Sequence, residues 1–469
     1  MSSITAPAYD PTTTAQALAQ KTTAAAQQIL TNQTNTAGAT STGLSKLGSA
    51  ISAFQSSLSS LTGLGKSVLA QTATLSDTGI GTATAKAGAP SGSYSVFVQQ
   101  LATSSQVSYN NLSDGRSAGG ILKVKLADEG AGTTTASFDV DLSSASADTD
   151  KDGVLSIREV AAAINRSSGN NGLVSAGVVT IGTESRLVLT SKNTGVANTV
   201  SLDASGVTDT ALQTGLGART TIAAAQDAII KLGGQASGTQ IKQASNTFTN
   251  IDGVSMTFTR AQAPTENDIT LKVAGDTNGT VSNVQAFVDA YNKLKSAIDT
   301  LVDAGDPGKD QAAGAFAHDA GIKALQSRLV SLVRSTSTSS LASYGIVATR
   351  DGTLSLDSTR LTKQLTANPN GLDELIGSAS SSSPTGIAGS MNTYLNLWSN
   401  SATGQIKQRN DAVTKLQSTL SQRQTDLDAQ FDSAYSRYLK QFTQLQTLQS
   451  TMTSNVSLFD ALFSSDKSN

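Results

Sequence analysis

Two long stretches with apolar residues at alternating intervals of three and four positions constrain the fold of this chain more than any other feature. The first runs from Leu44 to Leu75. This spacing is typical of a coiled-coil seam, in which one narrow stripe of a helix is buried. A helix of this length spans about 48 Å. The Ala/Gln-rich residues 14–37 precede it, with few large apolar anchors, and favour a helix that is marginal alone.

The second stretch covers residues 405–463, which as one helix would span roughly 88 Å. Its spacing shifts by a four-residue step after Leu427, a stutter that suits a boundary between packed layers. The apolar positions are Val413, Leu416, Leu420, Leu427, Phe431, Tyr435, Tyr438, Phe442, Leu445, Met452, Val456, Phe459 and Phe463. We therefore expect the two terminal helices to pack against each other, with both chain ends at one end of an elongated molecule.

Between about residues 83 and 278 the apolar period changes to two, which is typical of antiparallel strands with one polar face. The alternation is clear in residues 94–98, 122–126, 138–142 and 256–260. Helical signals within this region are limited to residues 156–165 and 222–232. Seam-like spacing returns in residues 284–302 and 322–332. The predicted class is α+β, elongated, with antiparallel β-rich head domains inserted between long N- and C-terminal coiled-coil-like helices.

These patterns predict a domain order. An N-terminal helical segment covers residues 1–42, and a helical leg domain combines residues 43–82 with 279–404. A β-rich head domain combines residues 83–115 with 216–278, and a second, outer head domain covers residues 116–215. The C-terminal coiled-coil helix, residues 405–469, is expected to pack with the N-terminal segment.

Composition excludes several classes of function. Only 14% of the 469 residues are charged and 38% are hydrophobic, against about 25% and 45–50% in ordinary soluble proteins. The net charge of −2 provides no field to hold nucleic acid or an anionic membrane. With no Cys and one His, His318, the chain lacks the residues for thiol catalysis, disulfides or ordinary zinc sites. We expect no enzyme and assign no catalytic residues.

Sequence features also bear on the compartment. The N-terminus shows no basic segment followed by an apolar run, so no cleaved secretory signal is expected. No run of eighteen apolar residues occurs, and a membrane span is not expected. Ser and Thr together number 123. A low-charge, Cys-free chain of this kind is typical of proteins that work outside the cell, which here requires an export route without a cleaved signal.

The sharpest local motif lies in residues 148–159, which we call the acidic loop. It fits the calcium-loop pattern D-x-D-x-D-G-x5-E, whose ligands come from loop positions 1, 3, 5, 9 and 12. Those positions hold Asp148, Asp150, Asp152, Ser156 and Glu159, and a structural Ca²⁺ is one interpretation. The entering helix of a paired EF-hand is missing, because a strand is expected there. The alternative is a solvated Asp-rich turn that caps the following helix without metal.

Six short motifs, in order along most of the chain, resemble the bacterial flagellar filament cap family (FliD, flagellar hook-associated protein 2). Gly92-Ser-Tyr94-Ser-Val96 is similar to the start of the first head strand in that family. The other five similar segments are residues 163–165, 246–257, 287–292, 351–357 and 438–445. No single motif is decisive, but their order around a β head is specific.

The resemblance implies a structural cap at the distal end of the flagellar filament, which retains exported flagellin and promotes its polymerisation. It also implies a secreted, extracellular homo-oligomer whose partners are flagellin, a flagellar export chaperone and the hook-filament junction protein. No nucleic acid is among them, and no cofactor is required. The alternatives are an extracellular adhesin or calcium-dependent binding module, and a flagellin-like filament subunit.

Overall fold

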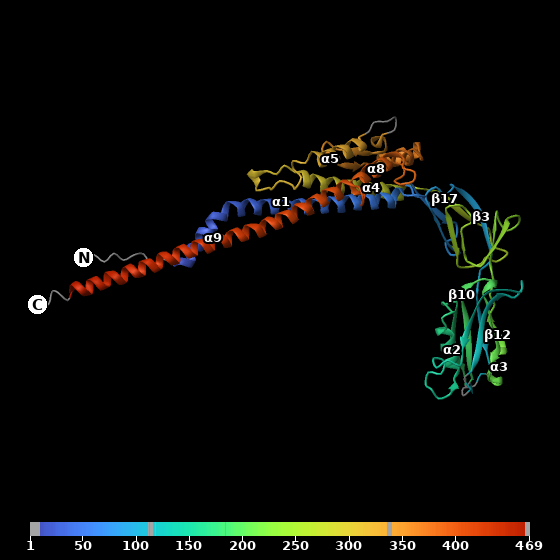
Figure 1. Cartoon of the computed structure of the whole chain (residues 1–469). Helices are drawn as coiled ribbons and strands as arrows, with labels where there is room; N and C mark the ends of the chain where they lie inside the picture. The colour runs from blue at the N-terminus through green and yellow to red at the C-terminus, as the bar shows by residue number, and fades with distance from the viewer. Residues whose placement is uncertain are drawn as a thin grey trace. The chain divides into compact units, whose positions relative to one another are not determined.

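The fold is taken from a computed structural model that describes residues 10–110, 112, 116–117, 119–182, 184–334 and 340–464. The chain divides into two compact units, residues 1–68 with 281–469 and residues 69–280. Long helices belong to the first unit and antiparallel sheets to the second (Figure 1). This arrangement confirms the α+β class. Within the described ranges, no helix combines the length and apolar character needed to cross a membrane.

The first unit is built mainly from helices. They are α1 (Pro11–Thr62), α4 (Thr277–Val302, whose first turn belongs to the second unit), α5 (Ala320–Val333), α6 (Ser358–Ala367), α7 (Gly371–Ile376), α8 (Gly386–Ser399) and α9 (Gln405–Ser464). The short elements are the 3₁₀ turns η2 (Pro307–Lys309) and η3 (Leu341–Tyr344) and the hairpin β18 (Ile346–Ala348) and β19 (Leu354–Leu356). The single helix α9 confirms the predicted continuous C-terminal helix.

The helix α1 follows the predicted seam only in part. Asp10 caps its start by accepting hydrogen bonds from the amides of Thr12 and Thr13, and Pro11 occupies the first turn. The seam residues Leu44, Leu47, Ile51, Phe54 and Leu58 are all buried.

The prediction that this helix continues to Leu75 is wrong. It ends at Thr62, the Gly63 amide donates to the Ser59 carbonyl, and Gly65 has a φ of 70°. A left-handed glycine of this kind stops a helix. The following residues form the strand β1 (Ala70–Leu75), which pairs with β17 (Ile269–Asp276). Partners distant in the sequence therefore outweigh the local spacing.

One core of the second unit lies between two sheets. The first has the strand order β1-β17-β3-β13-β14, with β3 at Gly92–Gln100, β13 at Ala228–Leu232 and β14 at Thr239–Gln243. The second has the order β15-β16-β2, with strands at Thr247–Phe248, Val254–Phe258 and Gly81–Ala85. Alternate residues such as Val96 and Val98 are buried in a cluster that includes Phe248 and Phe258, whose ring centroids are 5.8 Å apart.

A separate core, formed from residues 107–216, contains the acidic loop. Its sheets have the orders β12-β4-β10-β9 and β11-β6-β7, and β5 pairs with β8. The elements are β4 (Ser104–Tyr109), β5 (Arg116–Ser117), β6 (Gly120–Asp128), β7 (Thr133–Asp141), β8 (Val154–Leu155), α2 (Ile157–Arg166), β9 (Val174–Ile181), β10 (Glu184–Thr194), η1 (Val196–Asn198), β11 (Thr199–Val207), α3 (Thr210–Gly217) and β12 (Arg219–Ala223). As predicted, α2 is helical and β7 precedes the acidic loop.

The helix predicted over residues 222–232 is absent. Residues 222–223 end β12, and residues 228–232 form β13, which pairs with both β3 and β14. The Ala-rich run has good helix propensity, but Ile230 is buried in the sheet core. Hydrogen bonding to strands on both sides and burial of alternate residues outweigh a weak local preference.

Candidate functional site

The two terminal helices form an antiparallel pair. Gln27 on α1 lies against Gln424 on α9, and Thr22 lies 3.5 Å from the Tyr438 hydroxyl, so residue numbers rise along α1 as they fall along α9. Leu30, Ala37, Leu420 and Leu427 form a buried cluster between the helices. The helices run side by side in Figure 1. The expectation that the two terminal helices pack against each other is confirmed for these parts of α1 and α9.

Burial on α9 follows one heptad row. Val413, Leu420, Leu427 and Ala434, seven residues apart, are buried. The predicted change of phase after Leu427 is not seen in this row: Phe431 and Tyr435 are half-buried beside it, their parallel rings 6.3 Å apart. Nearer the start of α1, the small residues Ala15 and Ala19 are buried as well.

Beyond this pair, α9 carries an exposed row that we call the α9 stripe: Leu445, Leu448, Met452 and Val456. Their exposed fractions are 42–59%, although all are apolar. Figure 1 shows α9 continuing past the start of α1 in this region. Sequence spacing identified Leu445, Met452 and Val456, but not Leu448, which widens the stripe. Single exposed apolar residues are ordinary, whereas a contiguous row marks an interaction site.

A polar junction that the sequence did not reveal joins α9 to the other helices. The Arg409 guanidinium donates to the Asp319 carboxylate and lies 5.5 Å from the centroid of the Trp398 ring. Asp319 also caps α5, because its carboxylate accepts from the Ile322 amide at 3.0 Å. Burial raises the pKa of Asp319, but hydrogen bonds from Arg409 and Ile322 outweigh it and hold the pKa below its ordinary value. The adjacent His318 is exposed.

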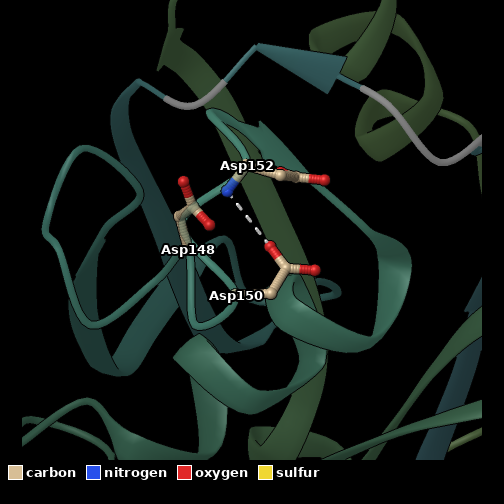
Figure 2. Close-up of side chains that lie close together, drawn as sticks. All are labelled: Asp148, Asp150 and Asp152. Carbon is tan, nitrogen blue, oxygen red and sulfur yellow. Dashed lines mark hydrogen bonds between the residues drawn. The ribbon is translucent and has the colours of Figure 1, made fainter.

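The acidic loop brings three of its five predicted ligands together. The carboxylates of Asp148, Asp150 and Asp152 each offer an oxygen within 4.8 Å of the others (Figure 2). Asp148 Oδ2 accepts from the Gly153 amide at 2.9 Å, and Asp150 Oδ1 accepts from the Asp152 amide at 3.3 Å. Lys151 and Gly153 have φ values of 61° and 81°, which turn the chain tightly. The turn gathers carboxylates at loop positions 1, 3 and 5.

Ser156 and Glu159 have a different arrangement from the three aspartates. They form a capping box at the start of α2: the Ser156 hydroxyl accepts from the Glu159 amide, and Glu159 Oε2 accepts from the Ser156 amide at 3.0 Å. Glu159 Oε1 accepts from the amide and hydroxyl of Thr149 at 2.7 and 2.9 Å. The Ser156 amide is the main cause that lowers the pKa of Glu159 to about 2, with further help from Thr149.

The environment of the aspartates is strongly acidic. The Asp152 amide lowers the pKa of Asp150, but desolvation, the nearby carboxylates of Asp152 and Glu159, and a side-chain hydrogen bond with Asp148 together raise it above its ordinary value. Asp148 Oδ1 is buried and accepts no hydrogen bond. Carboxylate oxygens at this spacing are ligands that Ca²⁺ accepts.

Comparison with known proteins decides the family. The model for the flagellar hook-associated protein 2 N-terminus matches residues 8–105, and the model for its C-terminus matches residues 225–454. The chain is 34% identical over 387 residues to the lateral flagellar hook-associated protein 2 of Vibrio parahaemolyticus, covering 82% of this chain and 84% of that relative. The chain belongs to the flagellar hook-associated protein 2 family.

Other members of the hook-associated protein 2 family agree along most of the chain. The Escherichia coli relative is 28% identical, with 94% of each chain covered. The crystal structure of the D1-D2-D3 domains of the E. coli flagellar cap protein FliD has a TM-score of 0.59 at 24% identity, covering 79% of this chain and 99% of that one, and shows the same fold. The resemblance drawn from sequence motifs is confirmed, and the adhesin and flagellin-like alternatives are not favoured. The acidic loop lies outside both matched ranges.

Proposed function

We propose that this chain caps the distal end of the bacterial flagellar filament, where it retains exported flagellin and promotes its polymerisation. Membership of the hook-associated protein 2 family over most of its length carries this proposal. Such a role is structural, and it requires binding surfaces rather than a catalytic centre.

The α9 stripe is the surface best suited to the filament end. A helix with one apolar face gains stability when a second helix covers that face. Val456 and its neighbours on α9 are exposed in the single chain, so partner subunits would bury them on assembly. We assign this stripe to contacts with flagellin at the filament end and with neighbouring copies in a homo-oligomeric cap.

Export to the flagellum tip is part of the proposal. A Cys-free, weakly charged chain forms no disulfides and can pass through a narrow channel before folding. An export chaperone would cover the apolar positions of the terminal helix inside the cell. Contact with the hook-filament junction protein would hold the cap before the first flagellin arrives.

A deletion strain tests this function. Cells that lack the chain are expected to release unpolymerised flagellin into the medium and to carry short or missing filaments, and the intact gene should restore both. Full-length filaments in the deletion strain, without released flagellin, would contradict the proposal. Electron microscopy of filaments and immunoblotting of the culture medium provide the two readouts.

A further inference from the structure

The acidic loop contains an oxygen atom that the protein itself does not satisfy. Asp148 Oδ1 is buried with no hydrogen-bond donor, while the other oxygen of the same carboxylate accepts from Gly153. A buried polar atom without a partner is unfavourable and rare in folded proteins. This atom lies in the same cluster as the carboxylates of Asp150 and Asp152 (Figure 2), where a cation would satisfy it.

No cation of the described residues neutralises the cluster. Among the described residues, no Lys or Arg forms an ion pair with Asp148, Asp150 or Asp152. Three carboxylates so close together repel one another, and the repulsion is strong where water is partly excluded. A bound cation would remove the repulsion and pair with Asp148 Oδ1.

A role in capping α2 does not account for the aspartates either. The cap of that helix is the reciprocal pair Ser156 and Glu159, whose side chains and amides satisfy one another. The carboxylates of Asp148 and Asp152 instead accept from amides of the turn, Gly153 and Val154. The turn holds the aspartates in place, with one oxygen of each within 4.8 Å of the others.

We propose that the acidic loop binds one Ca²⁺ through the carboxylates of Asp148, Asp150 and Asp152. This site is separate from the contacts through which the chain would cap a filament. The ligands are hard oxygen atoms, which suit Ca²⁺ or Mg²⁺. Ca²⁺ suits such a loop better, because Mg²⁺ demands near-ideal octahedral geometry and gives up its water reluctantly.

The capping box predicts the strength of binding. In a complete calcium loop the carboxylate at position 12 is a bidentate ligand, but both oxygens of Glu159 already accept hydrogen bonds from Thr149 and Ser156. Water would then complete the coordination shell. With fewer protein ligands, affinity should fall in the range of extracellular modules, with a Kd of about 10⁻⁴–10⁻³ M.

Binding would stabilise the fold of the surrounding core. A ligand that binds only the folded state multiplies the ratio of folded to unfolded protein by one plus the ratio of ligand concentration to Kd. At a Ca²⁺ concentration ten times Kd, that ratio rises about elevenfold. The ion would thus fix the turn between β7 and α2.

Calorimetric titration of the chelator-treated full chain with CaCl₂, at constant ionic strength, tests the proposal. We expect about one Ca²⁺ per chain, with a weaker response to MgCl₂. The double substitution Asp150→Asn with Asp152→Asn should abolish binding, because neutral amides remove two charges but keep the size of the side chains. Asp252→Asn, which changes an exposed aspartate outside the loop, should bind as the unmodified chain does.

Thermal unfolding provides a second measurement. Ca²⁺ should raise the melting temperature of the unmodified chain and of Asp252→Asn, and should leave the double variant unchanged. Circular dichroism in chelator checks that the variants fold. If the double variant does not fold, the single substitution Asp150→Asn replaces it and is expected to weaken binding at least about tenfold. The proposal is overturned if 10 mM Ca²⁺ produces no binding, if Mg²⁺ acts equally, or if the folded variants bind as strongly as the unmodified chain.

Discussion

Gln27 and Gln424, 397 positions apart in the sequence, exchange two side-chain hydrogen bonds. Gln27 Nε2 donates to Gln424 Oε1 at 3.0 Å, and Gln424 Nε2 donates to Gln27 Oε1 at 3.1 Å. This reciprocal pair can form only when the two helices keep one register. The apolar contacts beside it stabilise the terminal helix pair.

The first prediction concerns the apolar cluster beside this pair. Leu420→Ala removes a side chain that is 3% exposed and should lower the free energy of unfolding of the helical unit by about 2–5 kcal/mol. Leu448→Ala is the matched control on the same helix, because Leu448 is 57% exposed, and should change it by less than about 0.5 kcal/mol. Urea unfolding followed by circular dichroism at 222 nm measures both. Equal effects would contradict the packing of α1 on α9.

Substitution by alanine should change the stability of the helical unit in opposite directions at two glycines of α1. A Cβ at Gly38 would meet nothing within 4 Å, so Gly38→Ala should stabilise the unit by about 0.5–1 kcal/mol through helix propensity. A Cβ at Gly43 would lie 2.8 Å from the ring of the buried Phe316. Overpacking costs about 1–3 kcal/mol, which exceeds the gain in propensity.

Thermal unfolding of the two alanine variants checks this pair. Gly43→Ala should melt below the unmodified chain and Gly38→Ala above it. A higher melting temperature for Gly43→Ala would show that the loop containing Phe316 does not pack on α1.

Acid should weaken the core around the acidic loop through Glu159. Hydrogen bonds lower its pKa from 4.5 to about 2, so the unfolded chain takes up a proton at higher pH than the folded chain does. The stabilisation is complete above about pH 4.5 and is lost as the pH falls toward 2. Glu159→Gln should therefore melt at a lower temperature at pH 7 and lose less stability between pH 4.5 and 2.

Scanning calorimetry across this pH range compares the two proteins, with Asp252→Asn as the control for a substitution outside the network. The difference in melting temperature between the unmodified chain and Glu159→Gln should shrink as the pH falls. A difference that stays constant from pH 7 to pH 2 would mean that the Glu159 carboxylate does not act through its charge.

The α9 stripe should matter for assembly and not for the stability of the single chain. Val456→Asp places a charge on the stripe, whereas Ser457→Asp places the same charge on the next residue, about 100° around the helix. We expect the purified variants to have similar melting temperatures. In a strain that lacks the native chain, only Val456→Asp should fail to restore swimming and should release flagellin. Equal motility of the two strains would show that assembly does not depend on the α9 stripe.

Sequence patterns predicted the helices that are determined by the spacing of nearby apolar residues. The seam from Leu44 to Leu58 and the continuous helix α9 needed only the apolar spacing. Residues 70–75 and 228–232 could not be assigned correctly, because their strand form depends on β17, β3 and β14, which are distant in the chain. Ile29 and Leu30 are equally apolar neighbours on the N-terminal helix, yet Ile29 is 59% exposed while Leu30 is buried. Spacing alone does not fix which side of a helix meets its partner.

The candidate calcium loop shows the same limit at the scale of single side chains. Spacing alone placed Asp148, Asp150 and Asp152 together, because a tight turn gathers alternate residues. It also assigned Glu159 to the same ligand set. In the structure both oxygens of Glu159 accept hydrogen bonds, from the amides of Thr149 and Ser156. The sequence pattern is equally consistent with this capping role and with a role as a ligand. The choice between a ligand and a cap depends on backbone geometry that a motif does not contain.

The most direct test of the cap function is the position of the chain on the flagellum. Because the chain contains no Cys, Ser237→Cys at an exposed position of the β-rich unit provides one site for a fluorescent maleimide. In living cells that carry this variant in place of the native chain, we expect one fluorescent focus at the distal end of each filament. Label along the whole filament, or only at its base, would contradict the account.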